Sequence, residues 1–453
     1  MAKTIRSYPK TLLILIFFIG ATMTTAIAKE QNKTKQQPTD FKSQIQTWET
    51  SNGANVLFIE SHENPIVDVQ VTFAAGSAYD GKNYGLASLT ASLLETGVKG
   101  IDENELINRI TEAGANISEH SSRDATTFSL RSMSIAQYLT PAVELFSKIL
   151  TTPIFPQTQF ERVKSQQLTA IKMDDQYPDE VAYKALMKAL YPNHPYGHPV
   201  DGTTDSVNGI TLDDVKAFYQ KYYVAKNATI AIIGDMDQQE ARALSERIIQ
   251  NLPVGEKAPA IAQPKPMTKS ETIHINFPSS QTTILKGTLG IKKGSPEFYA
   301  LSAANQVLGG DGMRTLLFEN IRKDRGLAYG AHSVFRTLKE QGFFLIEAKT
   351  RNDKANETLE VMNQTLNDFI KQGPTKDQLN QVKKYLIGSF PLSMATNRSK
   401  LSILSLIGFY HLPLDYMDTY TTNIEKLSPS EIKKSFDAII NPNKMITVTV
   451  GQG

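Results

Sequence analysis

Two stretches of this 453-residue chain repeat each other at a constant distance. The first, at 210–234, begins with ITLDDVK and ends with IAIIG, and the second, at 427–451, begins with LSPSEIK and ends with TVTVG. Lys216 and Gly234 of the first stretch each have their counterpart 217 residues later, so the two align without a gap. Each stretch is typical of a capped amphipathic helix that leads into a buried strand. A repeat of this length predicts a duplicated domain, because the units of a solenoid are much shorter.

The segment between the copies indicates where the two domains meet. Residues 255–268 (GEKAPAIAQPKPMT) hold three prolines and show no periodicity, which is typical of a linker. We therefore expect an N-terminal domain at 45–254 and a C-terminal domain at 269–453. The pattern predicts strands at 56–60, 67–75, 127–132, 228–234, 283–291 and 343–349, and helices at 140–150, 157–174, 212–223, 297–308, 354–371 and 375–390.

The start of the chain has the three parts of a signal peptide. Residues 1–28 have a basic beginning, a short apolar run at 12–21 and the small-residue sequence AIA at 26–28. An uncleaved membrane anchor is the alternative, but the apolar run is short for a span of about 20 residues. The polar, Gln-rich residues that follow, to 44, predict a disordered lead-in. We expect an exported, periplasmic protein with no stable membrane insertion after cleavage.

Charge and cysteine content exclude several classes of protein. The formal net charge is +2, and removing Lys3, Arg6 and Lys10 with the signal peptide leaves −1. A nucleic-acid-binding protein normally carries a clustered basic excess, so this class is not expected. The chain has no cysteine, which excludes disulfides, thiolate zinc sites and thiol catalysis.

A strand, a glycine-rich turn and a helix follow one another between residues 67 and 100. Apolar residues alternate along 67–73, and leucines then recur at helical spacing from Leu86. This arrangement resembles the pitrilysin, insulin-degrading-enzyme and mitochondrial-processing-peptidase family, whose helix carries an inverted H-x-x-E-H zinc motif. Here the two histidine positions are Ser88 and Ser92, and the glutamate position is Ala91.

The family's third zinc ligand is absent as well. It is a glutamate on a later helix, and its position by spacing is Thr169. Serine, alanine and threonine neither complete a zinc site nor act as a general base at neutral pH. The resemblance therefore implies a zinc-peptidase scaffold that holds no cofactor in this chain.

Two weaker motifs have ordinary structural explanations. GSAYDGKN at 76–83 matches a phosphate-binding loop except for the final residue, Asn83, and a tight turn is the favoured interpretation. His194 and His198 are four residues apart, but prolines follow both and prevent a regular helix. Loop packing is favoured over an adventitious metal.

A second family signature is intact in the C-terminal half. In the family an arginine and a tyrosine, with six residues between them, reach toward the active site; here they are Arg322 and Tyr329, and Arg325 is the nearest alternative for the arginine. A guanidinium and a phenol are fixed donors that can hold a peptide carbonyl. Without the resemblance they would be interpreted as a surface arginine and a core tyrosine. The resemblance also implies that backbone at the upstream glycines approaches an extended peptide: Gly309, Gly310 and Gly312.

The resemblance extends from about Trp48 to Gly451 and implies the overall design. We expect an α+β fold of two homologous domains, each a mixed β-sheet with helices on one face, joined as a clamshell. Some relatives divide the work between two chains, one of which brings the zinc. The leading hypothesis is a zinc-less subunit of a periplasmic heterodimeric metallopeptidase, whose partner is a zinc-bearing homologous chain and whose ligand is a peptide. The alternatives are a non-catalytic peptide-binding or scaffold homodimer, and a zinc enzyme with unrecognised ligands.

Overall fold

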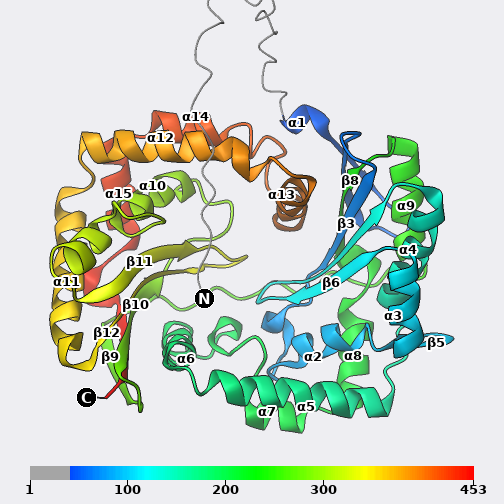
Figure 1. Ribbon diagram of the computed structural model, residues 1–453, viewed down its shortest axis with the longest axis horizontal. Helices are drawn as coiled ribbons and strands as arrows, with labels where there is room; N and C mark the ends of the chain where they lie inside the picture. The colour runs from blue at the N-terminus through cyan, green and yellow to red at the C-terminus, as the bar shows by residue number, and fades with distance from the viewer. Residues whose placement is uncertain (1–40, 453) are drawn as a thin grey trace, which may run out of the picture.

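The computed structural model describes residues 41–452, and the chain forms two halves, each built around one β-sheet (Figure 1). The N-terminal sheet has six strands in the order β1-β2-β8-β3-β7-β6, and β2 and β8 are its parallel pair. β8 is a run of seven buried residues, because strands flank it and helices cover both its faces. The strands are β1 (Ile45–Glu49), β2 (Asn55–Glu60), β3 (Ile66–Phe73), β6 (Asn116–Ser121), β7 (Thr126–Met133) and β8 (Ala228–Gly234).

The C-terminal sheet repeats this topology without a counterpart of β1. Its five strands lie in the order β9-β13-β10-β12-β11, and β9 and β13 are the parallel pair. They are β9 (Glu271–Asn276), β10 (Gln281–Leu289), β11 (Ala328–Arg336), β12 (Phe343–Arg351) and β13 (Ile446–Gly451). The predicted α+β fold with two related mixed sheets is confirmed.

Equivalent helices show how closely the halves correspond. α8 (Leu212–Tyr222) and α15 (Pro429–Ile439) begin and end 217 residues apart, the offset of the sequence repeat. Each begins with a reciprocal capping box, at Thr211 and at Ser428, in which side chains satisfy backbone N–H groups that the first helical turn leaves free. The duplication is therefore present in the three-dimensional structure as well as in the sequence.

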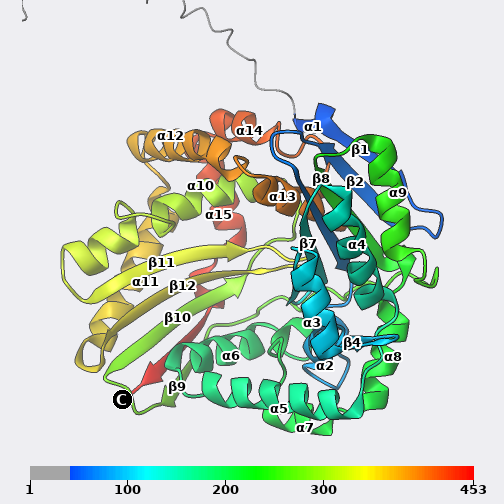
Figure 2. The same ribbon diagram turned by 45° about the vertical axis from the view of Figure 1, so that its right-hand side comes forward.

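Other helices pack around the two sheets (Figures 1 and 2). In the N-terminal half they are α1 (Phe41–Gln44), α2 (Leu86–Leu93), α3 (Glu103–Glu112), α4 (Ala136–Thr151), α5 (Gln157–Asp174), α7 (Thr204–Gly209) and α9 (Gln238–Ile249). In the C-terminal half they are α10 (Phe298–Leu308), α11 (Ala355–Gln372), α12 (Lys376–Ser393) and α14 (Tyr420–Lys426). A two-stranded ribbon of β4 (Gly97–Val98) and β5 (Ile101–Asp102) follows α2.

Two further helices are exchanged between the halves. α6 (Pro178–Leu190) leaves the N-terminal half and packs on β10 and β13 of the C-terminal sheet, whereas α13 (Asn397–Tyr410) packs on β8, β3 and β2 of the N-terminal sheet (Figures 1 and 2). The 217-residue offset carries α6 onto 395–407, so the exchange is reciprocal. Neither helix is among the elements that the sequence predicts. Each buries apolar side chains of one half against the sheet of the other, which joins the halves tightly.

A buried carboxylate fastens this joint. Asp124 lies at the tip of the hairpin between β6 and β7 and is 1% exposed. Its oxygens accept hydrogen bonds from Tyr196 OH at 2.5 Å, from the Lys339 backbone N–H at 2.8 Å and from Tyr410 OH at 2.9 Å. Burial raises the pKa of both tyrosines, so each keeps its proton. One N-terminal carboxylate thus holds two segments of the C-terminal half.

The predicted disordered lead-in at 29–44 is wrong for its last four residues. Residues 41–44 form α1, because Phe41 is buried and its backbone N–H donates to Asp418 at 2.6 Å. The predicted signal peptide at 1–28 lies outside the described residues, as does most of the lead-in. Over residues 41–452, no helix is both long and apolar enough to cross a membrane.

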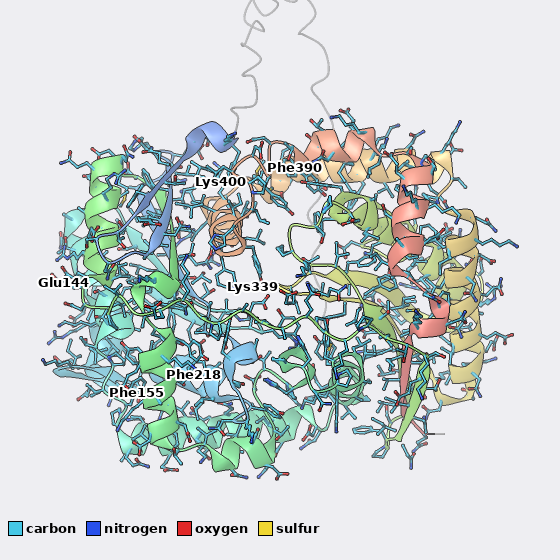
Figure 3. The ribbon with its side chains drawn as sticks, turned by 180° about the vertical axis from the view of Figure 1, so that it is seen from behind. Glu144, Phe155, Phe218, Lys339, Phe390 and Lys400 are labelled. Atoms are coloured by element: carbon cyan, nitrogen blue, oxygen red, sulfur yellow. The ribbon has the colours of Figure 1, made fainter. Side chains whose placement is uncertain are left out.

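The predicted linker at 255–268 has no helix or strand and runs between the halves (Figure 3). It is fastened to the N-terminal half, because the Ala258 N–H donates to Asn227 Oδ1 at 3.0 Å and Ile261 is buried. The His194 ring also bonds the Ala262 carbonyl at 2.7 Å. The linker is therefore held in place along the surface between the two sheets by hydrogen bonds and by a buried side chain.

Candidate functional site

The turn before α2 is packed around a buried carboxylate. Asp80 accepts the N–H of Gly85 at 2.7 Å and of Ala87 at 2.8 Å, so it caps the start of the helix. Gly85 has φ of 92°, a left-handed conformation that favours glycine. Burial raises the pKa of Asp80 well above its usual value. The loop at 76–83 is thus a tight helix entry, as the sequence predicts.

Polar side chains line one side of α2 and the turn that follows it, which we call the serine face: Ser88, Ser92 and Glu95. All three are half-buried, and each serine donates to a carboxylate. Ser88 Oγ lies 2.6 Å from Asp201 Oδ1, and Ser92 Oγ lies 3.0 Å from Glu119 Oε1 on β6. The helix brings the residues together because positions four apart share a face.

Acidic side chains surround the serine face, and burial raises the pKa of two of them. Burial, and then the neighbouring Glu119 carboxylate, raise the pKa of Glu95 to about 7. Burial also raises the pKa of Glu119, although the bond from Ser92 opposes this. The Glu95 Oε1 atom is buried without a hydrogen-bond partner. These carboxylates are poorly solvated and hold their protons to unusually high pH.

The other two predicted zinc positions are not directed toward the two serines. Ala91 is fully buried in the apolar core. Thr169 is exposed on α5, and its hydroxyl donates to the Ser165 carbonyl of its own helix at 2.8 Å. The α5 residue that reaches toward α2 is Gln167, whose amide donates to the carbonyls of Gly85 and Asp201.

The second predicted pair, by contrast, is brought together in the C-terminal half. Arg322 lies on a single π-helical turn, Phe318–Lys323, and its guanidinium carbon is 4.5 Å from the centre of the Tyr329 ring and 4.9 Å from that of Phe318. Such cation–π contacts orient the guanidinium without neutralising it. Tyr329 is 83% exposed. Arg325 is instead directed back to its own turn, donating to the Asn320 carbonyl at 2.8 Å.

The glycine loop before this turn is shaped by packing. A Cβ on Gly309 would come within 2.7 Å of Ser333 Oγ and within 2.5 Å of the Leu317 side chain, so a larger residue does not fit. Gly310 is equally confined by Gln306, whereas Gly312 faces open space with φ of 121°. The part of the loop that is free to approach a ligand is therefore Gly312 and its neighbours.

The serine face and the Arg322/Tyr329 pair lie far from each other. β11 begins just before Tyr329 at the outer side of the C-terminal half and runs toward the N-terminal half (Figures 1 and 2). Its far end, Arg336, leads to Lys339, which contacts Asp124. The seven residue steps from Tyr329 to Arg336, at about 3.3 Å each, place the pair roughly 23 Å from that end of the strand. Within one chain the two groups do not form a single site.

Comparison with known proteins agrees with this architecture. A family model described as "Insulinase (Peptidase family M16)" matches residues 55–204, and one described as "Peptidase M16 inactive domain" matches 209–386. The crystal structure of a peptidase M16 inactive domain from Pseudomonas fluorescens is 37% identical, with a TM-score of 0.87, and the match covers 90% of this chain and 98% of that one. The chain belongs to the M16 peptidase family. The predicted family resemblance is confirmed.

Relatives within the M16 family carry differing names. The "Non-peptidase homolog YmxG" of Helicobacter pylori is 26% identical over 83% of this chain and 87% of the relative. The "Uncharacterized zinc protease YmxG" of Bacillus subtilis is 22% identical over 79% and 86%. A protease from Helicobacter pylori, 19% identical with a TM-score of 0.82 over 90% of this chain and 99% of that one, shares the fold.

The residues of this M16 chain do not fit the zinc ion of the active peptidases. The serine hydroxyls are committed as donors to carboxylates, and Thr169 faces away. Over residues 41–452, no cluster of three or more His, Cys, Asp or Glu side chains is arranged to hold a metal ion. The His194 ring bonds backbone, and His198 stacks on Tyr84 with ring centres 4.2 Å apart, so both histidines serve loop packing.

Several residues around α2 carry chemistry that the sequence does not single out. They are Glu95, Glu119, Asp201 and Arg123. Glu95 has a detectable signal, because it lies three residues after Ser92, at the spacing of neighbours on one side of a helix. The others come from distant segments and meet only in the folded chain.

Proposed function

We propose that this protein is a zinc-less M16 subunit that binds peptide and works with a zinc-bearing homologous chain in a heterodimeric peptidase. The observation that carries the proposal is the contrast between its two family motifs. The positions of the zinc motif are Ser88, Ala91 and Ser92, whereas Arg322 and Tyr329 are retained and in contact. A subunit that has lost hydrolysis but keeps donors for a peptide carbonyl is suited to act on another chain's substrate.

The exposure of the pair supports a role toward a partner. Among the described residues, no carboxylate forms an ion pair with Arg322, and the Tyr329 phenol projects into solvent. A guanidinium and a phenol held in this way are preorganised to donate to a substrate carbonyl and to the oxyanion that develops from it. Arg322 and Tyr329 would orient the peptide at the partner's active site, with backbone near Gly312 alongside.

The test is peptide cleavage by a reconstituted complex. The purified chain is mixed with a candidate H-x-x-E-H homologue from the same genome, and cleavage of a fluorogenic peptide is followed with wild-type chain, R322A and Y329F. Loss of an oxyanion donor should lower kcat about 100-fold with a smaller change in KM. R325A is the matched control, since Arg325 bonds its own turn, and it should leave kcat unchanged.

Complex formation is measured separately by size-exclusion chromatography. If the variants assemble and cleave as well as wild type, the orienting role is wrong. If the chain forms only a homodimer and never raises cleavage by any homologue, a non-catalytic peptide-binding or scaffold protein is the better description. Export is tested by fractionation, in which a periplasmic protein should appear in the osmotic-shock fraction shortened by 28 residues.

A further inference from the structure

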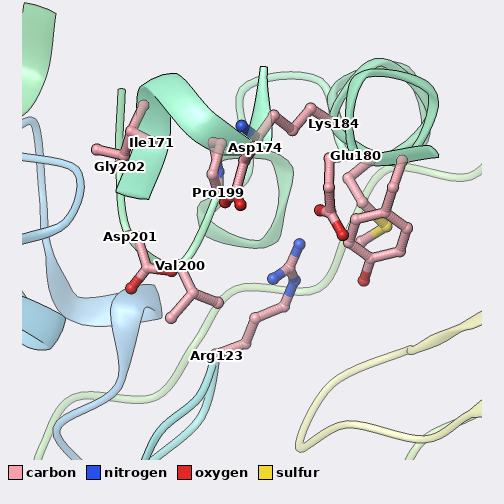
Figure 4. Close-up of a pocket in the computed structure, with 11 residues that line it drawn as sticks. Arg123, Ile171, Asp174, Glu180, Lys184, Pro199, Val200, Asp201 and Gly202 are labelled. Atoms are coloured by element: carbon pink, nitrogen blue, oxygen red, sulfur yellow. The ribbon is translucent and has the colours of Figure 1, made fainter. Parts of the chain in front are cut away.

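A small cavity lies beside the serine face, between the hairpin tip at Arg123 and the helices α5 and α6 (Figure 4). Its volume is about 150 Å³, and Asp201, which accepts the Ser88 hydroxyl, is part of its wall. Besides Asp201, charged side chains line it from three other segments: Arg123 from the hairpin, Asp174 from α5, and Glu180 from α6. Neither family motif accounts for this cavity.

Arg123 is unusual among the charges of the molecule. It is 7% exposed, and its Nε atom has no hydrogen-bond partner. Over the described chain, no carboxylate oxygen lies within 4.0 Å of its nitrogens. The centre of the Tyr183 ring lies 5.9 Å from the Arg123 guanidinium carbon. A buried guanidinium that has no close ion pair and whose Nε–H lacks an acceptor is costly, so a site that keeps one is suited to an acceptor that comes from outside.

The neighbouring residue shows that the fold can satisfy a buried charge at this point. Asp124, next in the chain, has three donors. The other cation of the cavity, Lys184, is already paired with Asp175 at 2.9 Å. The Arg123 guanidinium is therefore the donor available to an anion, and Figure 4 shows it directed into the cavity, toward the elements that carry Asp174 and Glu180.

The remaining charges determine which anion fits. Asp174, Glu180 and Asp201 surround the guanidinium with negative charge, which disfavours a dianion such as phosphate. A single carboxylate can form two parallel hydrogen bonds with a guanidinium. A cationic group attached close to that carboxylate would in turn meet Asp174 and Glu180.

We propose that this cavity binds the α-carboxylate of a basic amino-acid residue, with the carboxylate on Arg123 and the cationic group toward Asp174 and Glu180. The source is either the C-terminus of a peptide that ends in lysine or arginine, or the free amino acid. The site is complete within one chain and does not depend on a partner subunit or on the Arg322/Tyr329 pair.

Calorimetric titration of the full mature chain tests the proposal with four probes. These are the peptide Ala-Ala-Ala-Lys as the free acid, the same peptide as its C-terminal amide, Ala-Ala-Ala-Glu as the free acid, and lysine itself. The free acid ending in lysine should bind about 10- to 100-fold more tightly than the amide, because the amide loses charge-assisted hydrogen bonds to the guanidinium. The peptide ending in glutamate should bind more weakly than the one ending in lysine. Lysine binding as tightly as the peptide would identify the free amino acid as the ligand.

Variants of the protein separate binding from folding. R123M should abolish carboxylate binding yet melt at the same temperature as the ligand-free wild type or above it, since it removes an unpaired buried charge. R109M is the matched control: Arg109 is paired with Glu105 on α3, and this variant should bind like wild type. Equal affinity for acid and amide in the wild-type protein overturns the proposal whether or not R123M folds. A large loss of stability in ligand-free R123M also overturns it, because Arg123 would then have an internal structural role.

Discussion

The two halves of the molecule share one topology, but they differ in how well their buried polar groups are satisfied. Near α2 in the N-terminal half, several buried side-chain atoms lack a hydrogen-bond partner: Ser77 Oγ, Tyr79 OH, Thr90 Oγ1, Glu95 Oε1 and Arg123 Nε. In the described C-terminal half the one such atom is Glu340 Oε2, and it lies 2.5 Å from Lys292 Nζ in an ion pair. Native proteins satisfy nearly all such groups, so these exceptions distinguish the region around α2 from the rest of the described chain.

This difference shows where the duplicated domain diverged. The N-terminal copy kept a polar enclosure around α2 even though the side chains of a metal site are serines. In the C-terminal copy the equivalent region is closed by packing. Gly309 caps the end of α10, and its carbonyl accepts the Ser333 N–H at 2.6 Å, while the Ser333 hydroxyl donates to Asn305 at 2.8 Å. Asn305 occupies the position of Ser88 after the 217-residue offset. One copy therefore satisfies nearly all of its described buried polar groups, whereas the other carries several without a partner.

The largest effect should come from the fully satisfied carboxylate at the joint. Asp124→Ala leaves three buried donors unpaired and should lower the free energy of unfolding by about 4 kcal/mol. Urea unfolding measures this loss of stability. Circular dichroism reports on the whole chain, and the fluorescence of the single tryptophan, Trp48, reports on the N-terminal half.

Tyr410→Phe is the graded control, because Asp124 then keeps two donors, and it should cost about 1 kcal/mol. Equal costs for the two variants would show that Asp124 does not fasten the halves.

A pH-dependent effect of intermediate size should come from Glu95. Burial and Glu119 raise its pKa to about 7, above the unfolded value of 4.5, so its contribution to stability is greatest at low pH and is lost as the pH rises through 7. Glu95→Gln mimics the protonated acid. It should raise the free energy of unfolding by about 2 kcal/mol at pH 8 and leave it nearly unchanged at pH 5.

Glu431→Gln, in the C-terminal half, should show the opposite sign. Hydrogen bonds from Ser428 lower the pKa of Glu431, so its contribution is present at neutral pH and is lost as the pH falls. A pH-independent effect of Glu95→Gln would mean that Glu95 is ionised without penalty.

The smallest predicted change in stability comes from replacing a buried threonine on a helix of either half. Thr90 has a hydroxyl without a partner, whereas the Thr358 hydroxyl donates to the Lys354 carbonyl at 2.8 Å. Both are fully buried. Thr→Val keeps the shape of the side chain and removes its hydroxyl. Thr90→Val should therefore raise the free energy of unfolding by about 1 kcal/mol, and Thr358→Val should lower it by about the same amount. Thermal melts of the two variants give the sign directly, and the same sign in both would contradict the contrast between the halves.

Regular elements with strong periodicity were predictable from the sequence to within a few residues. Gln157–Asp174 and Ala228–Gly234 agree with the structure at both ends, because an unbroken pattern bounded by turns determines each of them. The Arg322/Tyr329 pair was predictable only because it matches a family motif, and the contact between the two side chains is seen only in the structure. The group of charged residues around α2 could not be predicted. Glu119, Asp201 and Arg123 come from separate loops and strands, and nothing in their local sequence distinguishes them from surface charges.

The sequence alone determined the duplication, because the repeat spacing can be read directly along the chain. The two-sheet fold and the replaced zinc positions were predictable through the family resemblance that its motifs carry. Only the tertiary structure decided that α6 and α13 exchange halves, since an amphipathic helix must bury its apolar face but does not specify which sheet receives it. The same packing determines which buried charged side chains form hydrogen bonds. Asp124 met two segments of the other half, whereas Arg123 was buried beside it without an acceptor.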